Sequence, residues 1–334
     1  MTKGLYQNPF IQTLHQGVEN LLPEWGLSGD TDLSLLCISE NATFLARDPQ
    51  RENPLVIRVH RPGYHTRAEI ESELAWIASL RENDTVITPA FVATQNGDSI
   101  TGFALGDEQR PVVAFEHIRG GQPDESGDLS DGFFQLGRIT ARLHQHARQW
   151  QRPDGFVRKI WNFETTVGAT PHWGDWREAM GLQEDGKFLL ERCTEVLKTQ
   201  LADYGSTPDR FGLMHADLRL TNLLADADQL AVIDFDDCGF SWFMYDFAAA
   251  ISFIETSPQI PALQTAWLEG YQQVATLSPA EIASLPMFIT LRRLLLTAWL
   301  ASHCETPTAQ ELGSDYTDGT LAIADNFLSN TQAA

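Results

Sequence analysis

Cysteine is scarce in this chain. The four cysteines, Cys37, Cys193, Cys238 and Cys304, lie far apart in the sequence and form no Cys-x-x-Cys pair. Such a set matches neither the disulfide framework of a small secreted domain nor the ligand spacing of a structural zinc site. We therefore expect the protein to work in a reducing compartment.

Basic residues are few as well. Lysine and arginine together number 23 against 45 aspartates and glutamates, which gives a net charge of −22. Binding to a nucleic-acid backbone requires clustered Lys and Arg, and an anionic membrane surface also repels a strongly acidic protein. The charge therefore disfavours both partners. It is compatible with a cationic substrate, although many cytosolic proteins are simply acidic.

Long apolar runs are also missing. Residues 1–17 contain no continuous apolar segment and no small-residue cleavage site, so no signal peptide is predicted. The most apolar stretch, residues 285–304, is interrupted by Arg292 and Arg293 and is interpreted as a buried helix rather than a membrane span. A soluble cytoplasmic protein is the expectation, and nothing in the sequence indicates its oligomeric state.

The first third of the chain is patterned as a small antiparallel lobe. Helical spacing of apolar residues predicts a helix over 9–22, and three short apolar runs predict strands over 33–38, 42–47 and 54–59. Thr66 is a candidate cap for a helix that runs to about Leu80. The segment Gln95–Asp98 predicts a hairpin between flanking strands, and residues 111–118 form a further strand. The expected lobe has five strands and one helix, spans residues 1–119, and is followed by a Gly-rich linker over 120–128.

The rest of the chain, residues 129–334, is predicted to be mainly helical. Helices are expected at 130–149, 185–203, 242–256, 261–276, 280–303 and 308–328. A loop with short strands separates the second of these helices from the third, and that loop carries the chemistry.

This loop segment, residues 212–247, contains carboxylates and an amide at informative spacings. Asp217 follows His215, Asn222 comes five residues after Asp217, and the apolar run Leu-Ala-Val-Ile leads to Asp234. A carboxylate beside an attacking hydroxyl can accept its proton, and amide and carboxylate oxygens are hard ligands that suit Mg²⁺. Base and metal ligands together are the equipment of phosphoryl transfer. Ordinary turn chemistry explains each residue alone but not the set.

These motifs resemble those of the aminoglycoside phosphotransferase and choline kinase-like family, a branch of the protein kinase-like fold. His-Ala-Asp-Leu-Arg-Leu-Thr-Asn looks like its catalytic loop and Ile-Asp-Phe-Asp-Asp like its metal-binding segment. The resemblance implies an α+β, two-lobed fold, with Asp217 as catalytic base and with Asn222 and Asp234 holding Mg²⁺. It also implies that His215 braces the loop and that Asp246 supports it from a helix start.

The same resemblance assigns nucleotide-binding residues in the first lobe. Arg58 stands where a kinase strand carries the lysine that contacts ATP phosphates, and Glu73 stands where its ion-pair partner is expected. The loop between the first two strands has Ser39 and Asn41 in place of several glycines. Backbone N–H groups and the hydroxyls of Ser39 and Thr43 would then cover the phosphates. The segment from Val113 to Ile118, which contains Glu116, looks like the hinge, whose backbone would bind adenine. A surface arginine at Arg58 and a solvated acidic face at Glu73 are the alternatives.

Two further features leave alternatives open. The aromatic-rich segment 161–176 is a candidate wall for the acceptor site, and core packing is the alternative role. Its aromatic residues include Trp161, Phe163, Trp173 and Trp176. Of the paired arginines Arg292 and Arg293, one is a candidate to face the pocket and bind a carboxylate, and solvent exposure is equally compatible. His144 is interpreted as a packing histidine.

The sequence thus predicts an ATP- and Mg²⁺-dependent phosphotransferase that acts on a hydroxyl of a small molecule. The subgroup of the family that the chain resembles includes homoserine kinase-like proteins and a bacterial stress-response protein kinase. An amine-bearing acceptor, such as an amino alcohol, homoserine or an aminoglycoside, is compatible with the acidic charge. A protein Ser/Thr kinase and a nucleotide-binding protein without catalysis are the alternatives.

Overall fold

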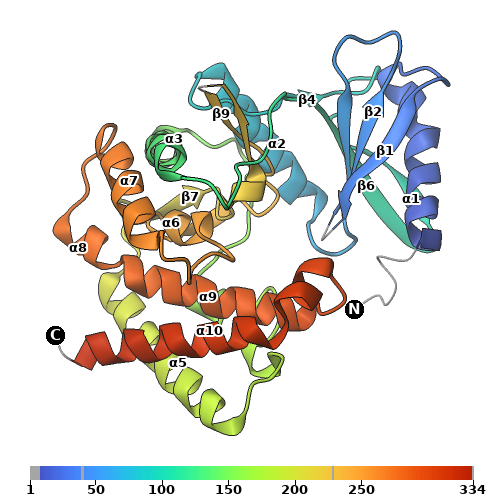
Figure 1. Ribbon diagram of the computed structural model, residues 1–334. Coiled ribbons are helices and arrows are strands. Elements are labelled where there is room, and N and C mark those ends of the chain that lie inside the picture. Colours follow the sequence, from blue (N-terminus) through green and yellow to red (C-terminus); the bar gives the residue numbers. More distant parts are fainter. Residues whose placement is uncertain (1–7, 39–40, 228, 333–334) are drawn as a thin grey trace. The chain divides into compact units, whose positions relative to one another are not determined.

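The computed structural model describes residues 8–38, 41–227 and 229–332, and the chain divides into two compact units (Figure 1). The first unit runs to residue 120 and also includes residues 152–158. The second unit contains residues 121–151 and everything from residue 159 onward. Each unit has a buried set of hydrophobic side chains of its own.

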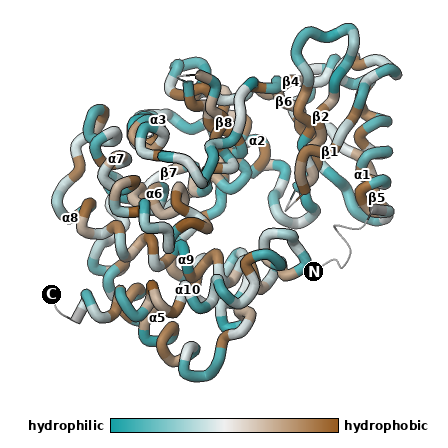
Figure 2. Tube along the Cα trace, viewed as in Figure 1, coloured by the Kyte–Doolittle hydropathy of each residue, from teal (hydrophilic) through white to brown (hydrophobic). Residues whose placement is uncertain are grey.

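The first unit is built on a six-stranded antiparallel sheet. Its strand order is β1-β2-β3-β6-β4, and β5 also pairs with β6. The strands are β1 (Asp32–Ile38), β2 (Ala42–Arg47), β3 (Leu55–Val59), β4 (Phe91–Val92), β5 (Thr101–Leu105) and β6 (Glu108–Glu116). Strands β1 and β2 carry hydrophobic residues over much of their length (Figure 2). The antiparallel lobe is as predicted. Its six strands correspond to the six apolar runs named from the sequence, although the expected total was five.

The predicted hairpin across Gln95–Asp98 is wrong. That segment does form a tight turn, in which the Thr94 N–H donates to the Asp98 carbonyl at 2.8 Å. The strands on either side do not pair with each other, however. β4 pairs with the end of β6 and β5 pairs with its beginning. β6 has nine residues and is long enough to pair with both flanking strands at different positions, so each of them pairs with β6.

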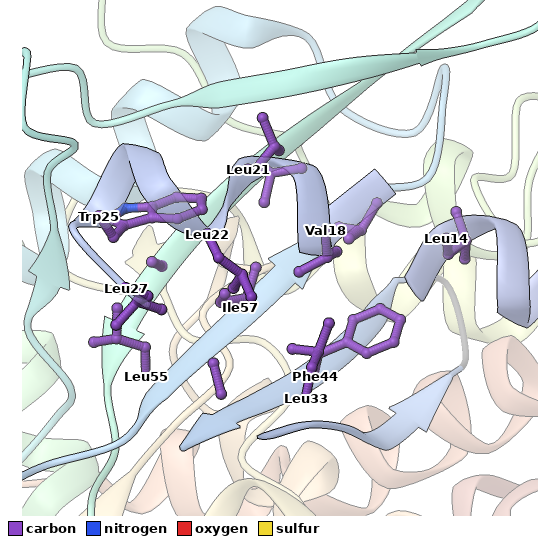
Figure 3. Packing of buried hydrophobic residues seen from close by; sticks show 14 of the residues in the cluster. Leu14, Val18, Leu21, Leu22, Trp25, Leu27, Leu33, Phe44, Leu55 and Ile57 are labelled. Atoms are coloured by element: carbon purple, nitrogen blue, oxygen red, sulfur yellow. The ribbon is translucent and has the colours of Figure 1, made fainter. Parts of the chain in front are cut away.

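The opening helix covers the sheet and closes the core of the first unit. α1 (Asn8–Leu21) continues into the short helix η1 (Leu22–Trp25). Leu14 and Val18 of α1 are buried in one hydrophobic cluster with Phe44 and Ile57 of the sheet (Figure 3). The amphipathic spacing predicted for this helix therefore serves to bury its apolar face against the strands.

The next helix, α2 (Arg67–Glu82), begins where the sequence predicts. The Thr66 hydroxyl accepts from the Glu69 N–H at 3.2 Å, and the Glu69 carboxylate accepts from the Thr66 N–H at 2.7 Å. This reciprocal capping box satisfies two N–H groups that the first helical turn leaves open. It orients a helix whose buried face also carries Glu73.

The second unit is mainly helical. Its α-helices are α3 (Ser130–Gln149), α4 (Phe163–Thr166), α5 (Glu184–Tyr204), α6 (Tyr245–Ala250), α7 (Ile260–Gln272), α8 (Pro279–Ala283), α9 (Leu285–Ser302) and α10 (Pro307–Gln332), and η2 (Trp176–Glu178) is a 3-10 helix. The helix predicted over 242–256 is shorter and spans only Tyr245–Ala250. It begins later than predicted because Trp242 belongs to the strand β10 (Gly239–Trp242). The helix predicted over 280–303 is two helices, because Ser284 ends α8 and Pro286 starts a new first turn.

Helix α9 lies in the interior of the second unit. By length and composition, residues Pro279–Ser302 would suffice to cross a membrane, but 78% of the apolar window is buried inside the protein. α9 packs against α6, α10 and η2. The interpretation of this stretch as a buried helix is confirmed. Its two adjacent arginines are therefore buried too, which makes their partners important.

Helices α3 and α7 cross at two glycines. A Cβ atom on Gly137 would lie 2.0 Å from the Trp267 carbonyl oxygen, and one on Gly270 would lie 1.9 Å from the Phe134 carbonyl oxygen. Both obstacles are backbone atoms, so a side chain cannot be accommodated by a rotamer change. The two helices approach closely because neither has a side chain at the crossing.

We expect Gly137→Ala to lower the free energy of unfolding by about 3 kcal/mol, because the added methyl group forces the two helix backbones apart. Urea unfolding followed by circular dichroism measures this change. Gly132→Ala on the same helix is the matched control, since nothing lies within 4 Å of its Cβ position. The control is expected to be neutral or to gain up to about 1 kcal/mol in helix propensity. Equal stability of the two variants would contradict the crossing argument.

Candidate active site

The catalytic-loop segment folds as short strands joined by tight loops within the second unit. β7 (Phe211–Met214) pairs with β10 (Gly239–Trp242), and β8 (Leu223–Asp226) pairs with β9 (Gln229–Val232). The short helix η3 (Leu220–Asn222) leads into β8. Asp217 and Asn222 lie between β7 and β8, and Asp234 lies just after β9. Local pairing thus brings the predicted base and both predicted metal ligands into one region.

Asp217 lies nearly buried in this loop, with both carboxylate oxygens hydrogen-bonded. Oδ1 accepts from the Arg292 guanidinium (Nη2) at 2.5 Å. Oδ2 accepts from Asn222 Nδ2 at 2.8 Å and from Arg219 Nε at 3.2 Å. Burial raises the pKa of the Asp217 carboxyl, but the positive charges of Arg219 and Arg292 outweigh burial and hold the pKa below its usual value. The group is therefore ionised at neutral pH, as a proton acceptor must be.

Asn222 and Asp234 are held next to each other by the backbone. The Ile233 N–H donates to the Asn222 carbonyl at 2.9 Å, so Asp234 begins directly beside Asn222. The Asn222 side-chain nitrogen donates hydrogen bonds to both the backbone carbonyl and Oδ2 of Asp217. The amide oxygen of Asn222 is therefore the atom that could act as a hard ligand to a metal ion. Asp234 is exposed and has a φ of 60°. An amide oxygen and an exposed carboxylate at adjacent positions fit a divalent cation chemically.

The backbone before Asp217 is strained and anchored. Ala216 has a φ of 67°, a left-handed conformation that costs a non-glycine residue about 1 kcal/mol or more. Its N–H donates to Oδ1 of Asp246 at 2.8 Å. His215, on the other side, contacts the Ile233 carbonyl through Nε2 at 3.1 Å. His215 and Asp246 thus hold the loop in the manner predicted for them.

Asp246 is itself fixed by a buried histidine. Its Oδ2 lies 2.9 Å from Nε2 of His144, whose Nδ1 lies 3.0 Å from the Tyr271 hydroxyl. Burial lowers the pKa of His144, and the bond to Asp246 only partly compensates, so the imidazole is neutral at neutral pH. The histidine is a packing and hydrogen-bonding residue of α3, as interpreted from the sequence.

In the first unit, Arg58 and Glu73 form a buried ion pair. Nη2 of Arg58 lies 2.7 Å from each Glu73 oxygen, and the two side chains are 7% and 0% exposed. The Arg58 guanidinium also lies over the Phe115 ring, at 5.2 Å from its centroid. Neither a surface arginine nor a solvated acidic face describes these residues. β3 and α2 bring them together from positions 15 residues apart in the chain.

The other predicted nucleotide residues make separate contacts. Ser39 lies outside the described residues. Oδ1 of Asn41, the residue before β2, accepts from the Arg61 N–H at 3.1 Å. The Glu116 side chain pairs with Arg51, and its N–H donates to the Ala90 carbonyl. Ile118 follows β6, and within the described chain its N–H donates to no backbone carbonyl.

Sequence reasoning left one part of the site undecided. One of the paired arginines was a candidate to face the pocket and bind a carboxylate, with solvent exposure equally compatible. The structure shows Arg292 buried, with its guanidinium on the carboxylate of Asp217. Arg293 binds Glu255 instead, and both arginines are buried. The role of Arg219 was not foreseen. For Arg292 and Arg293, the available signal was their position as two charges in an apolar helix, because buried charges need partners.

The aromatic segment forms a layer behind the site. Trp161, Trp173 and Trp176 are buried, whereas Phe163 is half-buried. Nε1 of Trp161 donates to the Asp237 carbonyl at 2.9 Å, and the Trp173 ring centroid lies 5.3 Å from the Arg292 guanidinium carbon. Trp161 thus contacts the segment that follows Asp234, and Trp173 packs against the guanidinium of Arg292.

Comparison with known proteins is consistent with this geometry. Residues 39–278 match the phosphotransferase enzyme family. The solved structure of a microcompartment-associated aminopropanol kinase is 44% identical, covers 94% of this chain and 97% of its own, and superposes with a TM-score of 0.87. The amicoumacin kinase of Bacillus subtilis (strain 168) is 26% identical over 299 residues, which are 86% of this chain and 84% of that protein.

A solved amicoumacin kinase, in complex with AMP-PNP, Ca²⁺ and Ami, shares the fold with a TM-score of 0.76 at 19% identity, and covers 96% of this chain and 95% of its own. These similarities confirm the predicted two-lobed kinase-like fold. The chain therefore belongs to the phosphotransferase enzyme family and is an ATP-dependent phosphotransferase that acts on a small molecule.

Proposed function

We propose that this enzyme transfers the γ-phosphoryl group of ATP to the hydroxyl of a small amino alcohol. The observation that carries the proposal is the ionised carboxylate of Asp217, held by two arginines and an asparagine beside a candidate cation site. Similarity to an aminopropanol kinase over 94% of this chain supports the amino alcohol as acceptor. The net charge of −22 suits a cationic substrate.

In the proposed reaction, Asp217 orients the acceptor hydroxyl and takes its proton. The hydroxyl oxygen forms a bond to the γ-phosphorus while the bond from that phosphorus to the bridging oxygen of ADP breaks. Asn222 and Asp234 would hold Mg²⁺, which, when bound, offsets negative charge on the phosphates. The strained Ala216 backbone, tied to Asp246, keeps Asp217 in place.

The first unit would bind the nucleotide. Arg58, kept in place by Glu73, would contact the phosphates. Ser39 and Asn41, which follow β1 in the sequence, would cover them. The Glu116 carbonyl and the Ile118 N–H would bind adenine, which is compatible with the absence of a backbone acceptor for that N–H in the described chain. The predicted lobe limits, residues 1–119 and 129–334, and the cytoplasmic location stay predictions.

The acceptor class is tested by a coupled ADP-release assay with matched acceptors. 1-Amino-2-propanol and 1,2-propanediol differ only in the replacement of the amine by a hydroxyl. We expect kcat/KM to be about 100-fold higher for the amine, because a paired ammonium group contributes several kcal/mol in a desolvated site. Ethanolamine, homoserine and an aminoglycoside complete the panel.

A parallel assay with radiolabelled ATP and a panel of proteins tests the alternative acceptor. Phosphate transfer to protein without turnover of any amino alcohol would overturn the proposal. Equal kcat/KM for the amine and the diol would leave a phosphotransferase but remove the amine from the recognised chemistry.

A further inference from the structure

An arginine in the middle of α9 is directed at the catalytic loop. Arg292 is 2% exposed, and each of its guanidinium nitrogens donates a hydrogen bond. Nε reaches the Ser252 hydroxyl at 3.0 Å, and Nη1 lies 3.3 Å from both the Ala216 carbonyl and the Tyr245 hydroxyl. Nη2 reaches Oδ1 of Asp217 at 2.5 Å. The rigid fork of the guanidinium thus joins α9, the loop after α6 and the catalytic loop at one point.

Stability alone does not explain a charge at this position. Removing a guanidinium and a carboxylate from water costs several kcal/mol each, and a well-packed hydrophobic pair of similar volume is often as stable. The rest of α9 is predominantly apolar. What distinguishes Arg292 is therefore its set of contacts, because it bonds both the Ala216 carbonyl and Oδ1 of Asp217 and so fixes the position of that carboxylate.

The two oxygens of Asp217 have different environments. Oδ1 is bonded to the buried Arg292. Oδ2 is bonded to Asn222 and to Arg219, whose side chain is 29% exposed, against 2% for Arg292. The contact between Oδ2 and Arg219 is also the longer of the two arginine contacts, at 3.2 Å against 2.5 Å. Of the two arginine contacts, the one at Oδ2 is the more readily replaced.

We propose that Arg292 is a positioning residue: it holds Oδ1 of Asp217 inside the protein, so that Oδ2 is presented to the acceptor hydroxyl when Arg219 gives way. This inference rests on the proposed function, because it assumes that Asp217 receives the acceptor hydroxyl. It adds which oxygen does so and which side chain sets its direction.

The adjacent residue provides an internal contrast. Arg293 is 3% exposed and lies 2.6 Å from Oε2 of Glu255. It also donates to the Thr320 hydroxyl at 2.9 Å and to the Tyr316 carbonyl at 2.7 Å, both on α10. Successive residues of a helix point about 100° apart, so the two arginines serve different neighbours. Arg293 makes a comparable buried ion pair that does not touch the catalytic loop.

The test compares Arg292→Gln, Arg292→Lys and Arg293→Gln in the full-length protein. kcat, both KM values and thermal unfolding are measured, with assays well below each melting temperature. We expect Arg292→Gln to lower kcat about 100-fold and to change KM for ATP by less than about 3-fold, since a small misplacement of a reacting group has this effect. Arg292→Lys is expected to recover about 10-fold of the loss, because an ammonium reaches Oδ1 without the other bonds.

Arg293→Gln is expected to lose thermal stability to a similar extent and to keep kcat within about 2-fold. Equal losses of kcat in Arg292→Gln and Arg293→Gln would overturn the inference, and so would a loss confined to KM. If Arg292→Gln does not fold, Arg292→Lys and Arg293→Lys make the same comparison.

A double variant separates this inference from the proposed function. Because Arg292 acts through Asp217, adding Arg292→Gln to Asp217→Asn is expected to cause no further loss of kcat. Additive losses would overturn the inference while the proposed base remains. Full activity of Asp217→Asn would instead remove the proposed function.

Discussion

Replacing Asp217 by asparagine is expected to lower kcat about 1000-fold, within the range measured for general-base groups. The amide cannot accept the proton of the acceptor hydroxyl, and it no longer offers a full negative charge to orient it. Binding of ATP is expected to persist, because the residues proposed to bind the nucleotide lie mainly in the first unit. ADP release measures kcat, and calorimetric titration with a non-hydrolysable ATP analogue measures binding.

Asparagine is a better replacement than alanine here. The Asp217 side chain accepts from buried Arg292, and alanine would leave that charge without its partner in the interior. Asp226→Asn is the matched control, since it makes the same change at an exposed position of β8 in the same segment. Wild-type kcat in Asp217→Asn would rule out Asp217 as the base.

Replacing Arg58 by methionine is expected to lower the free energy of unfolding by about 4 kcal/mol. The change leaves the carboxylate of Glu73 fully buried without its partner, and that residue is 0% exposed. Urea unfolding measures the loss. Arg47→Met is the control, because Arg47 lies in the same sheet as Arg58 and pairs with a carboxylate, that of Asp32, at an exposed position. It is expected to cost less than about 1 kcal/mol.

The double variant Arg58→Met with Glu73→Leu distinguishes stability from function. It removes both buried charges, so its stability is expected to return to within about 1 kcal/mol of the wild type. Activity is expected to stay low, because the variant lacks Arg58, the residue of β3 that is proposed to contact the ATP phosphates. A double variant as active as the wild type would show that the pair has only a structural role.

Much of the fold follows from local patterns. α3 begins and ends at the predicted residues 130 and 149, and Thr66 caps α2 as predicted. Helical periodicity and a capping box each involve residues that lie close together in the sequence. Tertiary packing therefore did not alter the helix limits that they predicted. The predicted hairpin across Gln95–Asp98 was wrong because strand pairing also depends on segments that lie further away in the sequence. Both flanking strands pair with β6.

By itself, the sequence determined the family, the candidate base and the candidate metal ligands, because Asp217, Asn222 and Asp234 lie within 18 positions in a recognisable spacing. Only the tertiary structure decided what the paired arginines do. Arg292 and Asp217 are 75 positions apart, and adjacent residues of a helix face different directions. A buried charge must find a partner wherever packing places one, and packing is a property of the whole second unit.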